Sequence, residues 1–114
     1  MNWLNLISYF FGGAFLCNAI PHVVSGLMGR PFQSPFAKPP GQGLSSSTVN
    51  VAWGVLNLAV AYILICSVGD FSLRSTADAA ILGLGFLLIG LFCARHFGRF
   101  HGGNSPKETD GVSR

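Results

Sequence analysis

Three long apolar segments dominate this sequence and limit what it can fold into. They run from about 3 to 28, from 48 to 68 and from 77 to 96, and nearly all of the charged residues lie outside them. A helix of about 20 apolar residues crosses the ~30 Å hydrocarbon core of a bilayer, where a central charge costs at least ~2.5 kcal/mol. Hydrophobic residues make up 50% of the chain and charged residues only 10%. We therefore expect an all-α integral membrane protein with three transmembrane helices.

The segments form one unit, and we expect a single transmembrane domain over 1–101. A loop rich in proline and phenylalanine, 29–47, joins the first two helices. The tail, 102–114, is polar and glycine-rich, with too few apolar residues to build a core, so we expect it to be disordered. No basic residue precedes the first segment and no small-residue cleavage site follows it. We therefore expect that segment to be retained rather than removed as a signal peptide.

Residues suited to helix ends and bends stand where this topology needs them. The serines at 45–47 suit the start of the second helix, because a hydroxyl can accept a hydrogen bond from an unpaired amide of the first turn. Ser75 with Asp78 three residues later fits a capping box at the start of the third. Pro21 lacks an amide and releases the carbonyl of an earlier turn, which predicts a kink in the first helix near 17–21.

The basic residues indicate how the chain is oriented. Of the seven Lys and Arg residues, six lie on the side that holds the loop 29–47 and the tail, and only Arg74 lies on the other. Basic residues in short connections favour the cytoplasmic side. We therefore expect the N-terminus outside and the C-terminus in the cytoplasm. The basic residues are scattered and form no basic helix face, so nucleic acid is not an expected partner.

Polar residues in the first two segments fall at matching depths. Counting ~1.5 Å per residue from their shared loop places side chains of the two helices opposite each other in the cytoplasmic half of the bilayer. Amides and imidazoles inside hydrocarbon must find partners in the protein, because lipid offers none. The sequence thus predicts one polar cluster as the candidate site: Asn18, His22, Asn50, Trp53 and Asn57.

Two interpretations of this cluster remain open from the sequence. An ionisable residue inside a membrane points to function, and histidine titrates near neutral pH, so His22 is a candidate for handling protons or a small molecule. Alternatively, His22 is neutral and joins the helices through a hydrogen bond to Asn50 or Asn57. Glycines on helix faces, which allow close approach of helices, are Gly26, Gly54, Gly83 and Gly90. They predict packing within the chain or a homo-oligomer.

The loop carries two Pro-Phe pairs between two basic residues. We expect Phe32 and Phe36 to insert at the headgroup boundary while Arg30 and Lys38 meet lipid phosphates, which would anchor the loop at the interface. The alternatives are a docking segment for another protein and a re-entrant lid over the polar cluster.

Cofactor and metal sites are not expected. Paired histidines commonly hold a b-type haem, but we place His96 at the cytoplasmic helix end and His22 about two turns deeper. His101 falls in the glycine-rich stretch beyond the third helix, 77–96, and is expected to be solvated. The cysteines at 17, 66 and 93 are expected at different levels, which argues against a metal site and against a disulfide.

The block PHVVSGLMGRPFQSPFAKPPGQGLSSSTVNVAWG covers about a third of the chain. It resembles small bacterial inner-membrane proteins that have no assigned activity. The resemblance implies a bacterial inner membrane and carries over no catalytic residue.

We therefore expect a small multi-pass membrane protein without catalysis of its own. Its role is that of an accessory or assembly partner, or of a homo-oligomer, with lipid, another membrane protein or a second copy as partners. The alternatives are a membrane protein that handles a small molecule or protons through the His22 cluster, and a subunit of a redox membrane complex.

Overall fold

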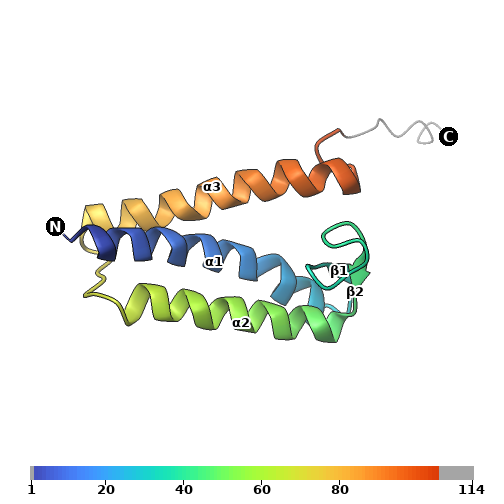
Figure 1. Ribbon diagram of the computed structural model, residues 1–114, viewed down its shortest axis with the longest axis horizontal. Helices are drawn as coiled ribbons and strands as arrows, with labels where there is room; N and C mark the ends of the chain where they lie inside the picture. The colour runs from blue at the N-terminus through green and yellow to red at the C-terminus, as the bar shows by residue number, and fades with distance from the viewer. Residues whose placement is uncertain (1, 106–114) are drawn as a thin grey trace.

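The computed structural model describes residues 2–105, which form three helices and one two-stranded antiparallel sheet. Each helix is long and apolar enough to cross a membrane, judged by length and composition. The expectation of three long apolar helices is therefore confirmed. In chain order the elements are α1 (Trp3–Leu27), β1 (Phe32–Gln33), β2 (Leu44–Ser45), α2 (Ser47–Cys66) and α3 (Thr76–His101) (Figure 1).

α2 and α3 begin where serine side chains cap them, and α1 begins after Asn2, whose side chain accepts hydrogen bonds from the Leu4 and Asn5 amides. The Ser46 hydroxyl accepts a hydrogen bond from the Val49 amide at 3.1 Å, and the Ser75 hydroxyl accepts one from the Asp78 amide at 3.2 Å. Each bond satisfies an amide that has no partner within its own helix. α1 is continuous through Pro21. The kink expected near this proline stays a prediction.

Two expectations from the sequence need correction. The chain is not purely helical, because the loop between α1 and α2 contains β1 and β2, in which Phe32 pairs with Ser45. α3 continues to His101 and ends at Gly102, whose left-handed φ of 80° suits glycine. His101 is thus the last residue of α3 and not part of the tail. Most of the expected disordered tail, 106–114, lies outside the described residues.

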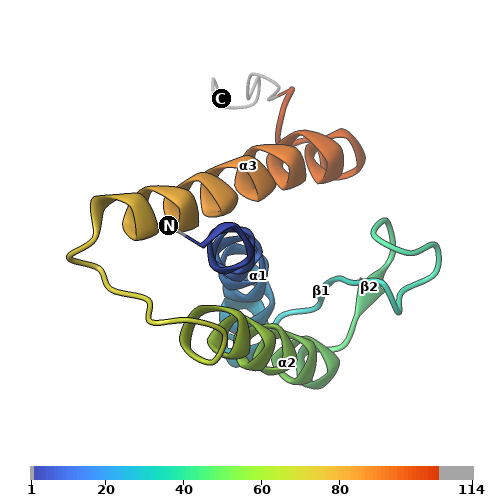
Figure 2. The same ribbon diagram turned by 60° about the vertical axis from the view of Figure 1, so that its left-hand side comes forward.

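α1 is the central helix, with α2 and α3 on opposite sides of it (Figures 1 and 2). Glycines let α1 and α2 approach closely. A Cβ added to Gly54 would lie 2.9 Å from the backbone nitrogen of Val23, and one added to Gly26 would lie 2.7 Å from the carbonyl oxygen of Ser47. Larger residues at these two positions would push the helices apart.

Other glycines make the contact between α1 and α3. A Cβ on Gly85 would overlap the carbonyl oxygen of Phe10, and one on Gly13 would overlap that of Leu82. Among the described residues of α3, Gly85 is the only buried one. In contrast, a Cβ on Gly83 would meet nothing within 4 Å, and one on Gly90 would make an ordinary 3.4 Å contact. The expected packing role of Gly83 within the chain is therefore corrected. Gly83 and Gly85 are two residues apart, which at ~100° per residue places them on nearly opposite sides of α3.

Side chains are distributed in the reverse of the pattern usual in water-soluble proteins. Buried positions hold small or polar residues, including Ala19, Asn50 and Asn57, at 0, 0 and 2% exposure. Large apolar side chains face outward, as Leu87 and Phe92 do on α3. Soluble proteins bury such side chains, whereas helices surrounded by lipid gain nothing from doing so.

Gly85→Ala should lower the free energy of unfolding by about 1–3 kcal/mol, because the added methyl group has no room between α3 and α1. Gly83→Ala is the matched control on the same helix. There the methyl group enters open space, and stability should stay constant or rise slightly because alanine is the better helix former. Thermal unfolding in one mild detergent, followed by circular dichroism, compares the two variants. Equal losses would contradict the α1–α3 contact described above.

Candidate functional site

Asn50 joins three segments of the chain through one buried side chain. Its amide nitrogen lies 3.1, 3.2 and 3.0 Å from the carbonyl oxygens of Phe32, Ser45 and Ser46, and its two hydrogens are shared among them. Its Oδ1 lies 2.6 Å from Nδ1 of His22. Because the three carbonyl oxygens can only accept, the amide nitrogen must face them and Oδ1 must face His22.

This arrangement assigns the tautomer of His22. An amide oxygen can only accept a hydrogen bond, so Nδ1 of His22 carries the hydrogen. In the neutral ring the other nitrogen, Nε2, is then an acceptor, and no residue within 2–105 donates to it. The side chain is 5% exposed and packs edge-on against Phe32, with 5.3 Å between ring centroids. The Nδ1 edge of His22 is therefore hydrogen-bonded to Asn50, and the Nε2 edge has no hydrogen-bond partner among the described residues.

A second pair of amides lies further along the same two helices. Asn18 Nδ2 donates to Asn57 Oδ1 at 3.0 Å, and Asn57 Nδ2 donates to the Trp53 carbonyl oxygen at 2.8 Å. The Trp53 ring lies edge-on to His22, with 6.5 Å between centroids. The structure thus brings the five residues of the predicted cluster together in two hydrogen-bonded pairs beside Trp53.

The loop 28–46, which we call the covering loop, folds back over this cluster. The Ser34 hydroxyl bonds to the Ser45 hydroxyl at 2.5 Å and accepts from the Phe36 amide at 3.0 Å. The Phe36 ring packs edge-on against Trp53, with 5.1 Å between centroids, although 60% of its side chain stays exposed. The loop also reaches α3, since a Cβ on Gly41 would lie 2.9 Å from Cε1 of Phe97.

The residues expected to anchor the loop at an interface thus occupy two different settings. Phe32 is half-buried against His22, whereas Arg30 and Lys38 are exposed. The position of the loop is that of the lid we considered as an alternative.

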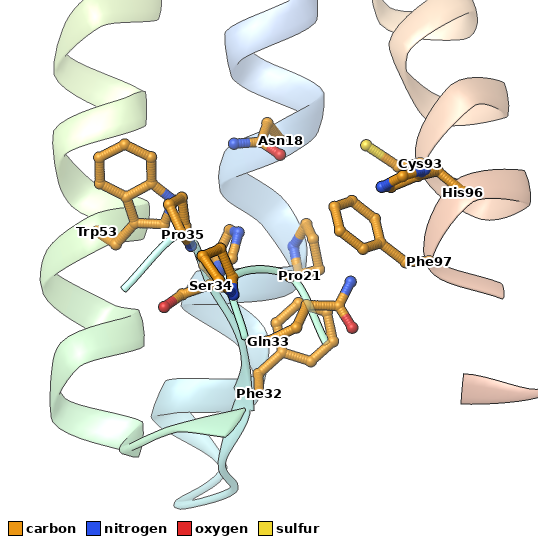
Figure 3. Close-up of a pocket in the computed structure, with 13 residues that line it drawn as sticks. Asn18, Pro21, Phe32, Gln33, Ser34, Pro35, Trp53, Cys93, His96 and Phe97 are labelled. Carbon is orange, nitrogen blue, oxygen red and sulfur yellow. The ribbon is translucent and has the colours of Figure 1, made fainter. Parts of the chain in front are cut away.

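A cavity of about 280 Å³ lies between the covering loop and the three helices. In Figure 3, α3 supplies Cys93, His96 and Phe97 on one side, facing Trp53 of α2 across Asn18 and Pro21 of α1. His22 and the loop complete the lining, and none of the described lining residues is Asp, Glu, Lys or Arg.

Sequence reasoning missed the contribution of α3 to this cavity. We expected His96 to lie two turns from His22 at a helix end, but α3 continues to His101 and both histidines line the same space. Nδ1 of His96 lies 2.8 Å from Nη2 of Arg99, which donates to it. Cys17 and Cys93, expected at different levels, both line a second small cavity between α1 and α3. Within 2–105, no three His, Cys, Asp or Glu residues gather as a metal site would require. The expectation that haem is absent stays a prediction.

Trp53 contributes an unused donor. Its indole nitrogen, Nε1, is buried and has no acceptor among the residues that the structure describes. A buried polar group without a partner costs about 1–3 kcal/mol. The cavity is therefore bordered by one residue with an unused acceptor, His22, and one with an unused donor, Trp53.

Comparison with protein-family models, with curated proteins and with solved structures finds no match for this chain.

Asn50→Leu should lower the free energy of unfolding by about 3 kcal/mol or more, because it removes the partner of the His22 Nδ1–H and the side-chain bonds to the Phe32 and Ser45 carbonyl groups, while the Ser46 carbonyl keeps the backbone amide of residue 50. Asn18→Leu, the matched control, removes one bond and should cost about 1 kcal/mol.

Hydrogen exchange of the covering loop separates a local effect from a global one. The amides of Ala37 and Gly41 donate to the Ser34 carbonyl oxygen at 3.2 and 3.0 Å. They should exchange faster in Asn50→Leu and not in Asn18→Leu. Unchanged loop exchange in Asn50→Leu would contradict the role we assign to Asn50.

Proposed function

We propose that this chain is a three-span integral membrane protein that binds a small molecule in the cavity beneath the covering loop, without catalysis of its own. The observation that carries the proposal is the pair of unused hydrogen-bonding groups on His22 and Trp53, which border one space. A buried donor without a partner, such as Trp53 Nε1, lowers the stability of the empty protein, and a bound molecule with a matching group recovers that loss.

Insertion into a membrane is supported by the outward-facing apolar side chains of all three helices. For the orientation we rely on the basic residues, six of which lie on the side of the covering loop and the tail. The N-terminus is then outside and the C-terminus cytoplasmic. The resemblance noted in the sequence favours the inner membrane of a bacterium.

A second role, as an accessory or assembly partner or as a homo-oligomer, is favoured by one feature of α3. Gly83 lies on an exposed face with open space above it, among large apolar side chains such as Leu84 and Leu87. A glycine on such a face lets a helix of another chain approach closely. Proton handling is a hypothesis that rests on His22, and membership of a redox complex is one that rests on His22 with His96.

The orientation is tested with reporters fused to the full chain in a bacterial host. Green fluorescent protein after Arg114 should fluoresce, because it folds in the cytoplasm, while alkaline phosphatase at the same position should be inactive. Alkaline phosphatase inserted after Leu73, between α2 and α3, should be active. The opposite pattern at both positions would contradict the orientation, and activity at both would contradict three spans.

Ligand binding is tested by native mass spectrometry of the chain purified in two different mild detergents. A fraction of the protein should carry the same non-covalent adduct in both. Cys93→Phe, which fills the cavity from α3, should reduce the adduct at least about tenfold, a change equivalent to ~1.4 kcal/mol. Leu91→Phe, on the exposed face of α3, is the matched control and should keep it. Absence of any adduct, or an adduct that survives Cys93→Phe, would refute the proposal.

A further inference from the structure

The cavity beneath the covering loop is not an isolated space. Asn18, Cys93 and Phe97 line it and also line a groove of about 350 Å³ between α1 and α3. The groove reaches the outside of the bundle at Phe11 and Phe92, which are 50 and 57% exposed. The two spaces therefore meet at Asn18, and one molecule can occupy both.

The two spaces differ sharply in polarity. Beyond the junction the groove is lined by hydrocarbon, as at Ala14, Phe15 and Ile89. Asn57, the other amide on its wall, already uses its oxygen for Asn18 and its nitrogen for the Trp53 carbonyl group. The unused groups of His22 and Trp53 lie instead at the loop-covered end. A ligand that fits both spaces has a polar head and an apolar tail.

The volume of the cavity supports a ligand divided into a polar head and an apolar tail. Sites that enclose a whole drug-sized ligand usually measure ~300–1,000 Å³. The loop-covered cavity, at about 280 Å³, lies just below that range, which suits a head group with the remainder of the molecule elsewhere. The groove offers the remainder a path to the outer face of the helices, where hydrocarbon would surround a membrane-embedded bundle.

The lining also restricts the charge of the head group. Among the described residues around the cavity there is no Asp, Glu, Lys or Arg to pair with a charge, and burying an unpaired charge is prohibitively costly. Arg30 and Lys38, which could meet a phosphate, are exposed and do not line the cavity. The head group is therefore uncharged.

Hydrogen bonding narrows the chemistry further. Nε2 of His22 needs a donor and Nε1 of Trp53 needs an acceptor, and a hydroxyl group supplies both. The indole nitrogen is covered in the present conformation, with Phe36 packed edge-on against its ring. For an acceptor to reach it, the Phe36 ring, which is 60% exposed, must move aside.

We infer that the occupant is a membrane amphiphile with an uncharged, hydroxyl-bearing head beneath the covering loop and a hydrocarbon chain in the groove between α1 and α3. This inference rests on the proposed ligand binding by the cavity. It places the entry route in the plane of the bilayer, through the groove, rather than through the loop from the cytoplasm.

Three probes test the head and the tail separately. Monoolein has the proposed head and a long chain, monoacetin has the same kind of head and only an acetyl group, and oleoyl lysophosphatidic acid joins the long chain to a charged phosphate. The full chain with Trp3→Phe keeps Trp53 as its only tryptophan, so fluorescence reports binding at the cavity. Monoolein should bind at least about tenfold more tightly than either of the other probes, since each buried CH₂ contributes to affinity.

Variants of the groove locate the tail. Ala14→Phe narrows the groove and should weaken monoolein binding about tenfold while leaving monoacetin binding unchanged. Ala59→Phe, on an exposed face of α2, is the matched control and should leave both unchanged. If Ala14→Phe fails to fold, Phe92→Ser, which removes apolar lining at an exposed position, should give the same selective loss.

The possible failures are distinguishable. Equal affinities for monoolein and monoacetin would overturn the tail site but leave ligand binding by the cavity intact. Tightest binding of lysophosphatidic acid would overturn the uncharged head. Absence of binding by all three probes to protein stripped of its native adduct, where unstripped protein carries that adduct, would overturn the amphiphile while sparing the proposed function. Loss of the native adduct as well would refute both.

Discussion

The hydrogen bonds of Asn50 hold the loop end of this molecule together. Its side chain reaches α1 through His22, the covering loop through Phe32 and Ser45, and the start of its own helix through Ser46. Only an amide combines two donor hydrogens with a separate acceptor at this size. Since Asn50 and His22 are buried, these bonds pair polar groups that would be costly to leave without a partner. The position of the loop and the tautomer of His22 both follow from this one residue.

The cavity exists because α1 contacts its two neighbours in different ways. Towards α2 it has close contacts at glycines and side-chain hydrogen bonds along its length, from Ser8 to His22. Towards α3 the tightest contacts are at Gly13 and Gly85, and one turn further the fit at Gly90 is already looser. The cavity lies past this contact, whereas the groove runs from Phe11, near Gly13, to Phe97. The covering loop closes the cavity end by touching Phe97.

Much of the contact between α1 and α2 could be predicted, because the two helices share one short loop and depth can be counted from it. That count places Asn18 and Asn57 at one level, where they are hydrogen-bonded, but it leaves either Asn50 or Asn57 as the partner of His22, and the structure has Asn50. The face and level of α3 could not be predicted in the same way. Its connection to α2 lies at the far end, so nothing in the sequence fixes its rotation, and Gly85 rather than Gly83 meets α1. The strands escaped notice because two-residue strands are too short to show a period.

The two interpretations of His22 that the sequence leaves open do not exclude each other, because they concern opposite edges of one ring. The Nδ1 edge is committed to Asn50, which makes His22 a structural link between α1 and α2. That commitment is also what leaves Nε2 as an acceptor beside the cavity. An indole N–H could also donate to the Asn50 oxygen, but a tryptophan has no acceptor to offer on its other side. The structural link and the proposed ligand binding therefore use different edges of the same ring, and one does not preclude the other.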